Sequence, residues 1–316
     1  METDVLYVVI PCYNEEEVLP ETVRRLTQKL EALQQAGKIA PESRMMLVND
    51  GSKDRTWELI CQFYEENPWV TGVNLSRNRG HQNALLAGLM TAKEKADAVI
   101  SMDADLQDDI DAIDRFMEEY EKGAEVVYGV RSSRQTDTFF KRNSALFFYR
   151  FMRKMGVDLT YNHADYRLMS RRALDALAQY KEVNLFLRGI VPMVGFRSVI
   201  VEYERHERFA GQSKYPLKKM LAFAIEGITS CSQKPLRLIT LVGLAISFLS
   251  FVYLIYALIS HFCGTTVDGW TTLAVLLCFF SGFQILCIGI IGEYIGKIYL
   301  ETKGRPRYII QDIKSK

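Results

Sequence analysis

The residues of this sequence that are best suited to chemistry lie in four short polar clusters, each placed directly after an apolar run. They occupy residues 11–15 (PCYNE), 49–54 (NDGSKD), 76–80 (SRNRG) and 103–107 (DADLQ). Any one of them could be a plain turn or a helix cap, since Ser52 and Asp54 are good N-cap residues. Their common placement raises the question of whether they meet in space.

The fourth cluster has the residue types of a divalent-cation site. Asp103, Asp105 and Gln107 offer hard oxygen ligands, which suit Mg²⁺ or Mn²⁺ shared with a diphosphate. An isolated Asp-x-Asp is common on protein surfaces, and its position after the apolar run 98–102 is what strengthens it here. No GxGxxG follows the first apolar run and no GxxxxGK[ST] occurs, which argues against dinucleotide-binding and P-loop sites.

The apolar runs alternate with amphipathic segments, and this order predicts an α/β domain with a mostly parallel sheet. The expected strands are 5–10, 45–48, 70–75, 98–102 and 125–130. The expected helices are 16–35, 56–66, 84–95 and 110–120. In such a sheet ligands bind beyond the carboxyl ends of the strands. The four clusters then share one edge, and this indicates a ligand site.

Two long apolar segments, 239–262 and 270–291, predict membrane-spanning helices, because each is long enough to cross about 30 Å of hydrocarbon. Between Ile239 and Ile291 the only formal charge is Asp268. A buried hairpin in a soluble core is the alternative, although soluble helices rarely stay apolar on all sides. The connecting loop lacks Lys and Arg while both outer flanks carry them, so both termini are expected in the cytoplasm.

Two further stretches carry basic residues of the kind found at membrane surfaces. Residues 140–155 form a basic amphipathic pattern, which fits either a membrane surface or a helix packed on the core. Residues 205–237 hold seven Lys or Arg against two Glu, just before the first apolar segment. That position favours contact with phospholipid or lipid-phosphate head groups over a plain solvated surface.

Overall composition excludes several classes of protein. The chain has 316 residues, 48% hydrophobic and 24% charged, with a net charge of +1, which excludes disorder and argues against a nucleic-acid binder. Its six cysteines form no CxxC pair, which argues against a disulfide framework or a zinc site and favours reduced thiols. Glu2 and Asp4 precede a short apolar run, unlike a signal peptide.

Taken together, the motifs resemble those of family 2 glycosyltransferases with the GT-A fold. The segments that carry this likeness are 8–15 (VVIPCYNE), 48–54 (VNDGSKD) and 103–107 (DADLQ). Later segments narrow the resemblance to bacterial polyprenyl-phosphate glycosyltransferases, such as bactoprenol glucosyltransferases, which are relatives of dolichyl-phosphate mannose synthase. They are 165–168 (DYRL), 208–215 (RFAGQSKY), 292–299 (GEYIGKIY) and 305–308 (RPRY). One departure is Asn49, where many relatives have Asp, so Asn49 is not expected to bind metal.

The resemblance implies a role for individual residues. The nucleotide-sugar pocket would be lined by Pro11, Tyr13, Asn14, Glu15, Asp50 and Asp103. Asp105 and Gln107 would bind Mg²⁺ or Mn²⁺, and Asp165 would orient the transferred sugar or act as a base. The acceptor phosphate would be bound by Arg131, Arg134, Arg208, Ser213 and Lys214. Asp105, Asp165 and Arg131 are therefore the residues expected to carry catalysis.

The implied reaction is the inverting transfer of a hexose from a UDP-sugar to polyprenyl (undecaprenyl) phosphate on the cytoplasmic leaflet of a bacterial plasma membrane. The product would be a lipid-linked sugar for modifying a cell-envelope polysaccharide. UDP-glucose and UDP-N-acetylglucosamine both remain open as donors, with residues 162–167 slightly closer to the N-acetylglucosamine-transferring members. The resemblance also implies a homo-oligomer, a tetramer in related proteins.

Three alternatives remain beside this interpretation. A processive polysaccharide synthase is disfavoured because no tryptophan follows an arginine, as its QxxRW motif requires. A flippase or channel is disfavoured by having only two spans without an intramembrane charge cluster. A catalytically inactive, membrane-anchored nucleotide-sugar sensor would be expected to lose part of the site. The expected organisation is a catalytic domain at 1–210, a basic segment at 211–237, a transmembrane hairpin at 238–292 and a cytoplasmic tail at 293–316.

Overall fold

The computed structural model describes residues 3–131, 154–155, 163–204, 228–229, 232–262 and 269–316. These residues fall into two compact units. The first draws on 3–131, 163–204 and 305–316, and the second on 154–155, 228–229, 232–262 and 269–304. The predicted amphipathic helix at 140–155 lies almost entirely outside the described residues, as does most of the basic stretch 205–237.

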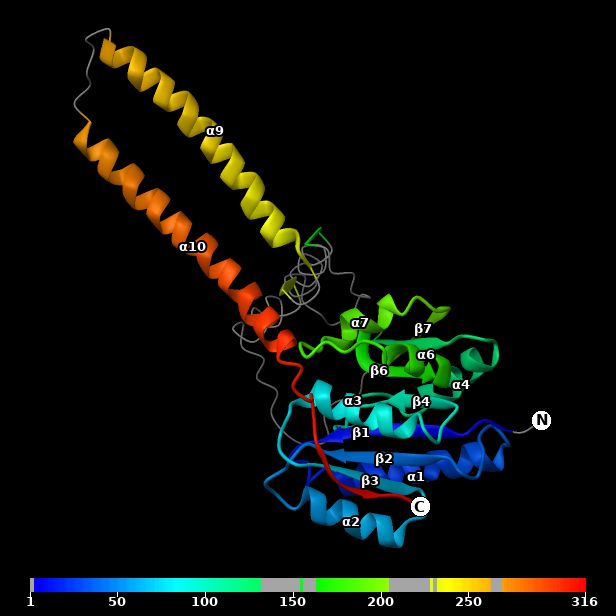
Figure 1. Cartoon of the computed structure of the whole chain (residues 1–316). Coiled ribbons are helices and arrows are strands. Elements are labelled where there is room, and N and C mark those ends of the chain that lie inside the picture. The colour runs from blue at the N-terminus through cyan, green and yellow to red at the C-terminus, as the bar shows by residue number, and fades with distance from the viewer. Residues whose placement is uncertain (1–2, 132–153, 156–162, 205–227, 230–231, 263–268) are drawn as a thin grey trace. The chain divides into compact units, whose positions relative to one another are not determined.

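The first unit is built on an eight-stranded sheet with the order β7-β5-β6-β4-β1-β2-β3-β8. Figure 1 shows β4, β1, β2 and β3 side by side in this order. The strands are β1 (Leu6–Cys12), β2 (Arg44–Asn49), β3 (Val70–Leu75), β4 (Ala98–Ser101), β5 (Val126–Arg131), β6 (His163–Ser170), β7 (Ser198–Tyr203) and β8 (Ile310–Lys314). The pairs β1–β2, β1–β4, β2–β3 and β5–β7 are parallel, whereas β6 and β8 run antiparallel to their neighbours. The predicted mostly parallel α/β sheet is confirmed.

Helices cover both faces of this sheet because successive residues of each strand point to opposite sides. They are α1 (Leu19–Gln35), α2 (Thr56–Glu66), α3 (His81–Ala92), α4 (Ala112–Glu121), α6 (Arg171–Leu177) and α7 (Leu187–Met193). On one face Val8 packs in a buried cluster with side chains of α1, α2 and α4. On the other face Val9 packs in a second cluster with side chains of α3, α6 and α7.

The predicted elements recur with small shifts at their ends. The helix 56–66 and the strand 70–75 have the expected bounds. The helix predicted at 84–95 begins at His81, directly after Gly80, whose φ of +85° turns the chain there. β6, β7, β8, α6 and α7 were not predicted.

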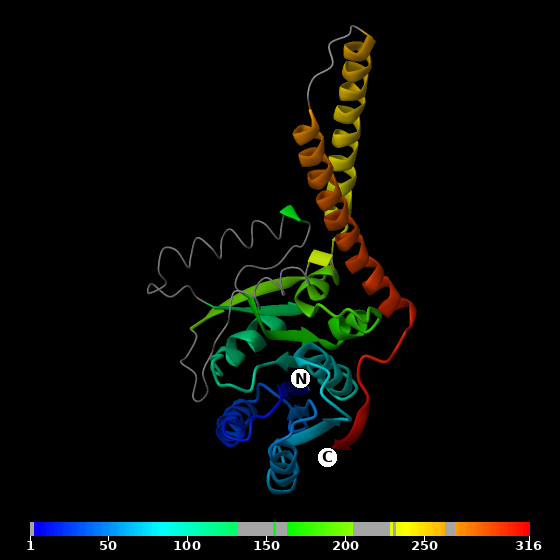
Figure 2. The same ribbon diagram turned by 90° about the vertical axis from the view of Figure 1, so that its left-hand side faces the viewer.

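The second unit contains the two apolar helices, α9 (Lys234–Phe262) and α10 (Trp270–Thr302), which run side by side in Figures 1 and 2. Each contains a stretch long and apolar enough to cross a membrane, Lys234–Tyr253 and Phe279–Thr302. Large apolar side chains are exposed along both helices, for example Phe248 and Ile288 at 68% and 66%. Near the helix ends, the Tyr294 hydroxyl donates a 2.6 Å hydrogen bond to the Ser232 carbonyl.

Close packing of α3 on the sheet generates a stability prediction. A Cβ atom added at Gly88 would lie 2.4 Å from Val9 Cγ1 and 2.7 Å from Val48 Cγ2. Gly88→Ala should therefore lower the melting temperature of the purified protein, since overpacking a core costs about 1–3 kcal/mol. At an open helix position the same change would stabilise by about 1 kcal/mol, so an unchanged or raised melting temperature would contradict this packing.

Candidate active site

Strand register brings the polar clusters to one edge of the sheet. Cys12 lies opposite Asn49, and Asn49 lies opposite Asn74, so the loops after β1, β2 and β3 begin at the same level. On the other side of β1, Val9 lies opposite Ser101, and the 103–107 loop follows. The expected shared edge is therefore present at the carboxyl ends of the parallel strands, where α/β sheets bind ligands.

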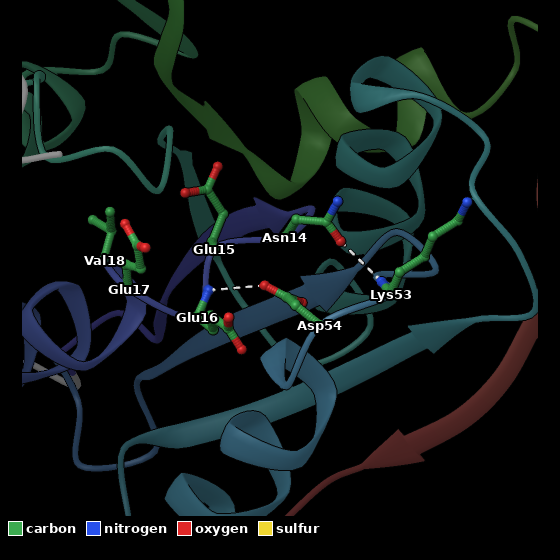
Figure 3. Close-up of a pocket in the computed structure, with 7 residues that line it drawn as sticks. All are labelled: Asn14, Glu15, Glu16, Glu17, Val18, Lys53 and Asp54. Atoms are coloured by element: carbon green, nitrogen blue, oxygen red, sulfur yellow. Dashed lines mark hydrogen bonds between the residues drawn. The ribbon is translucent and has the colours of Figure 1, made fainter. Parts of the chain in front are cut away.

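The loops after β1 and β2 are joined through their polar side chains. Asn14 Oδ1 accepts a 2.9 Å hydrogen bond from the Lys53 backbone amide (Figure 3). The backbone amide of Asn14 donates to Ser52 Oγ at 3.0 Å. Asn14 has φ +55°, a conformation that non-glycine residues seldom adopt and that recurs at functional sites. An open hollow of about 410 Å³ lies beside this junction, lined by Asn14, Glu15, Glu16, Glu17, Val18, Lys53 and Asp54.

The other residues assigned to the nucleotide pocket in this region differ in exposure. Tyr13 is 42% exposed, and Pro11 lies in β1 opposite Val48. The Glu15 amide donates a 2.9 Å hydrogen bond to Thr56 Oγ1, which fixes the start of the loop against α2. Contact of Pro11, Tyr13, Asn14 and Glu15 with a nucleotide stays a prediction.

Asp50 fixes the loop that follows β3. Its two carboxylate oxygens accept hydrogen bonds from the Arg79 and Gly80 amides, at 2.7 and 2.9 Å. Burial raises the pKa of Asp50, and these two amide donors oppose that rise. Gly51, with φ +63°, packs so closely that an added Cβ would lie 2.5 Å from the Asn78 nitrogen. The contact of Asp50 with uracil or ribose remains a prediction; its role in shaping residues 77–80 is visible.

The loop at 103–108 concentrates negative charge. Asp103 Oδ1 lies 3.2 Å from His81 Nε2, at the start of α3. Burial and the neighbouring Asp108 carboxylate raise the pKa of Asp103 to about 6. Leu106 has φ +56° although its side chain is buried, so the backbone here is strained. Backbone strain and a shifted pKa of this kind cluster at functional sites.

Several observations bear on whether a divalent cation fits this loop. Asp108 Oδ2 is buried without a hydrogen-bond partner among the described residues. Gln107 is buried, and its backbone amide donates to Asp105 Oδ1 at 3.2 Å. Among the described residues no group of three His, Cys, Asp or Glu side chains is arranged to hold a metal. The side chains of Asp105 and Gln107 and the unpartnered Asp108 Oδ2 nevertheless offer oxygen donors, the ligand type that Mg²⁺ and Mn²⁺ take in proteins. Their binding of a metal stays a prediction.

Arg131, at the end of β5, is held beside this loop. Its Nη2 atom lies 3.2 Å from Asp108 Oδ1, and its Nε atom donates to the Tyr203 hydroxyl at 3.2 Å. The Tyr203 hydroxyl also donates to Asp108 Oδ1, so the three side chains form a closed network. The other residues assigned to the acceptor phosphate lie outside the described part of the chain; they are Arg134, Arg208, Ser213 and Lys214.

Asp165 reaches the same edge through β6. Ser101 pairs with Arg167 in antiparallel register, which places Asp165 opposite the residues just beyond β4. Arg167 Nη2 donates to Asp165 Oδ1 at 2.7 Å, and Arg188 Nη2 donates to Oδ2 at 3.1 Å. Burial alone would raise the pKa of Asp165, but these guanidiniums hold it well below its usual range. A carboxylate this acidic is a poor base, so the arrangement favours an orienting role.

Two residues of this site were not identified from the sequence. Arg188 lies in α7, where its charge interrupts the otherwise apolar run 185–191, and that interruption was the available signal. The Leu187 amide donates a 2.9 Å hydrogen bond to Gln82 Oε1, which ties α7 to α3. His81 contacts Asp103, yet its position in the sequence gives no indication of this partner.

Comparisons with known proteins identify the family of this chain. Residues 7–178 match the family model described as Glycosyl transferase family 2, and residues 234–298 match that of the GtrB C-terminal hairpin. An uncharacterized glycosyltransferase of Bacillus subtilis (strain 168), YkoT, is 56% identical over 97% of this chain and 91% of its own length. A bactoprenol glucosyl transferase of Shigella phage SfX is 41% identical over 97% of this chain and 99% of its own.

Among solved structures, glucosyl-3-phosphoglycerate synthase from Mycobacterium tuberculosis was crystallised with Mn²⁺, UDP-glucose and phosphoglyceric acid. It is 17% identical, covers 72% of this chain and 78% of its own, and has a TM-score of 0.43. The GT-A-like α/β architecture followed by an apolar hairpin, which the sequence motifs implied, is confirmed. Since one family model spans most of the sheet and relatives match over nearly their whole length, this chain is a glycosyltransferase and belongs to glycosyl transferase family 2.

Proposed function

We propose that this glycosyltransferase moves a hexose from a UDP-sugar to a polyprenyl phosphate, with inversion at the anomeric carbon. The observation that carries the proposal is the anionic loop 103–108 next to the fixed guanidinium of Arg131, 3.2 Å from Asp108. The anionic loop suits a metal-bound diphosphate, and the guanidinium suits an acceptor phosphate. The bactoprenol glucosyl transferases among the relatives support an acceptor of this class.

On the donor side, Asp105 and Gln107 are the residues proposed to hold Mg²⁺ or Mn²⁺. When bound, the ion offsets the charge that grows on the departing UDP. Asp103, whose pKa is raised to about 6, is proposed to face the same diphosphate. Its contact with His81 holds its carboxylate in position. Pro11, Tyr13, Asn14, Glu15 and Asp50 are proposed to surround the nucleotide.

On the acceptor side, little proton transfer is needed. A phosphate monoester has a second pKa near about 6 and is therefore largely a dianion at neutral pH. The main requirement is to bring this dianion close to a negatively charged donor, and Arg131 is proposed to do so together with Arg134, Arg208, Ser213 and Lys214. Asp165, held ionised by Arg167 and Arg188, is then left to orient the sugar hydroxyls.

We further propose that α9 and α10 anchor the enzyme in the membrane that carries its lipid acceptor. β8 follows α10 in the chain and pairs with β3, so the segments before and after the hairpin share one sheet. An even number of membrane crossings satisfies this pairing, as two spanning helices do. Lys and Arg at the outer flanks of the hairpin favour the cytoplasm for that side. We also propose that the protein assembles as a homo-oligomer, namely a tetramer.

The reaction is tested with purified protein in detergent, undecaprenyl phosphate, Mg²⁺ or Mn²⁺ and a panel of radiolabelled nucleotide sugars. Label should enter the organic phase from one UDP-sugar, glucose or N-acetylglucosamine, and EDTA should abolish the transfer. UDP binding without any lipid-linked label from the whole panel would overturn the proposal. That result would favour a nucleotide-sugar sensor.

Removal of the proposed metal ligand gives the next prediction. Asp105→Ala should lower kcat at least about 100-fold, because the charge on departing UDP would lose much of its compensation. Asp111→Ala is a suitable control, since that carboxylate is 85% exposed and pairs only with Lys29 among the described ion pairs. Near-normal turnover of Asp105→Ala at saturating Mn²⁺ would remove Asp105 from the metal site.

Substitution of Arg131 tests whether this residue binds the acceptor or the donor. Arg131→Ala should raise the KM for polyprenyl phosphate about tenfold or more, because a hydrogen bond to a charged group contributes about 1.5–3 kcal/mol. The KM for the UDP-sugar should change much less. Arg172→Ala, which removes a 71% exposed guanidinium paired with Glu125, is the control. A larger effect on the donor KM would move Arg131 to the nucleotide side.

A further inference from the structure

The segment that follows α10 completes the sheet of the first unit. β8 pairs antiparallel with β3, with Val73 opposite Ile313 and Leu75 opposite Ile310. One residue before β8, the Ile309 carbonyl accepts a 2.9 Å hydrogen bond from the Ser76 amide. This contact lies at the point where β3 ends and the loop 76–80 begins.

The loop 76–80 is held at three points, one of which is this strand. Its far end donates the Arg79 and Gly80 amides to the Asp50 carboxylate. Its middle, at Arg77 and Asn78, packs on Gly51 with no room for a Cβ atom. Its near end is held by Ile309. Asp50 and Gly51 belong to the cluster that follows β2 and is assigned to the nucleotide pocket. Since β8 holds the loop that contacts both residues, β8 helps to set the geometry of this proposed pocket.

Contacts along its whole length fix the segment 307–316 to the first unit. Before the strand, Arg307 Nη2 donates to the Tyr180 carbonyl, and Tyr308 packs against the cluster that contains Val9. After the strand, Lys316 Nζ donates to the Asn67 carbonyl at 2.9 Å and lies 5.0 Å from the Tyr64 ring centroid. Because these contacts lie on both sides of β8, the strand is docked rather than loosely appended.

We propose that β8 is a positioning element for donor binding, which holds the loop 76–80 so that the loop and Asp50 present a formed pocket to UDP. Without β8, β3 becomes an edge strand with unpaired amides and carbonyls, and edge elements open more readily. In the sequence, only residues 303–308 lie between α10 and Ile309. The inference rests on the proposed function only in assigning this pocket to the nucleotide.

The test compares the full chain with a variant that lacks residues 306–316. Its matched control lacks only Ser315 and Lys316, and so keeps β8 and the Ile309 contact. UDP affinity is measured by calorimetry with Mn²⁺ in detergent, and amide exchange is followed at Arg79 and Gly80. We expect the dissociation constant for UDP to rise at least tenfold and both amides to exchange faster in the longer deletion alone. A synthetic peptide of residues 305–316 should restore both values, and a scrambled peptide should not.

A second preparation covers the case in which the deleted chain does not fold. A protease site is placed at the exposed Gly304, and the full chain is purified before it is cut and the released segment is washed away. UDP affinity within twofold of the uncut protein, with β8 removed and the helical content unchanged, would overturn the inference. Since UDP binding is measured without turnover, failure of the lipid-transfer assay with intact dependence on β8 would reject the proposed reaction only.

Discussion

The candidate active site depends on holding several carboxylates close together at one edge of a sheet. Each desolvated carboxylate needs a compensating donor or cation, because an unpaired buried charge is costly. Asp50 is compensated by two backbone amides and Asp165 by two guanidiniums. Asp108 is paired with Arg131, while Asp103 has a partner in His81 yet keeps a raised pKa. The remaining deficit of positive charge is what a divalent cation would supply.

These pairings also arrange the fold around the site, since each partner comes from a different element. His81 begins α3, Arg131 ends β5 and Arg188 lies in α7. Satisfying one carboxylate therefore fixes where a helix or strand ends relative to the others. The strained backbone at Leu106 lies between Asp103 and Asp108, and the strained backbone at Asn14 is held by hydrogen bonds to Ser52 and Lys53. The same ion pairs therefore contribute both to the stability of the fold and to the geometry of the site.

Local sequence patterns were sufficient for much of this arrangement. Alternation of apolar runs and amphipathic segments predicted β1 to β5 and their helices, and the clusters at 11–15, 49–54, 76–80 and 103–107 predicted the shared edge. What escaped prediction depends on partners distant in the chain. The antiparallel position of β6 between β4 and β5 is specified by pairing with both strands. The role of Arg188 follows only from its hydrogen bond to Asp165, which lies in a different element. β8 is similar, because four of its five residues pair with a strand more than 230 positions earlier.

The pairing of β8 with β3 also has a consequence for biosynthesis. β8 is encoded after both apolar helices, so a ribosome must translate α9 and α10 before the sheet can receive its last strand. The remaining strands can associate earlier, since domains generally begin to fold during synthesis. Completion of the sheet is therefore delayed until the hairpin has left the ribosome. The nascent chain passes through a stage in which β3 is an open edge, and that stage ends only when the segment beyond the hairpin folds back.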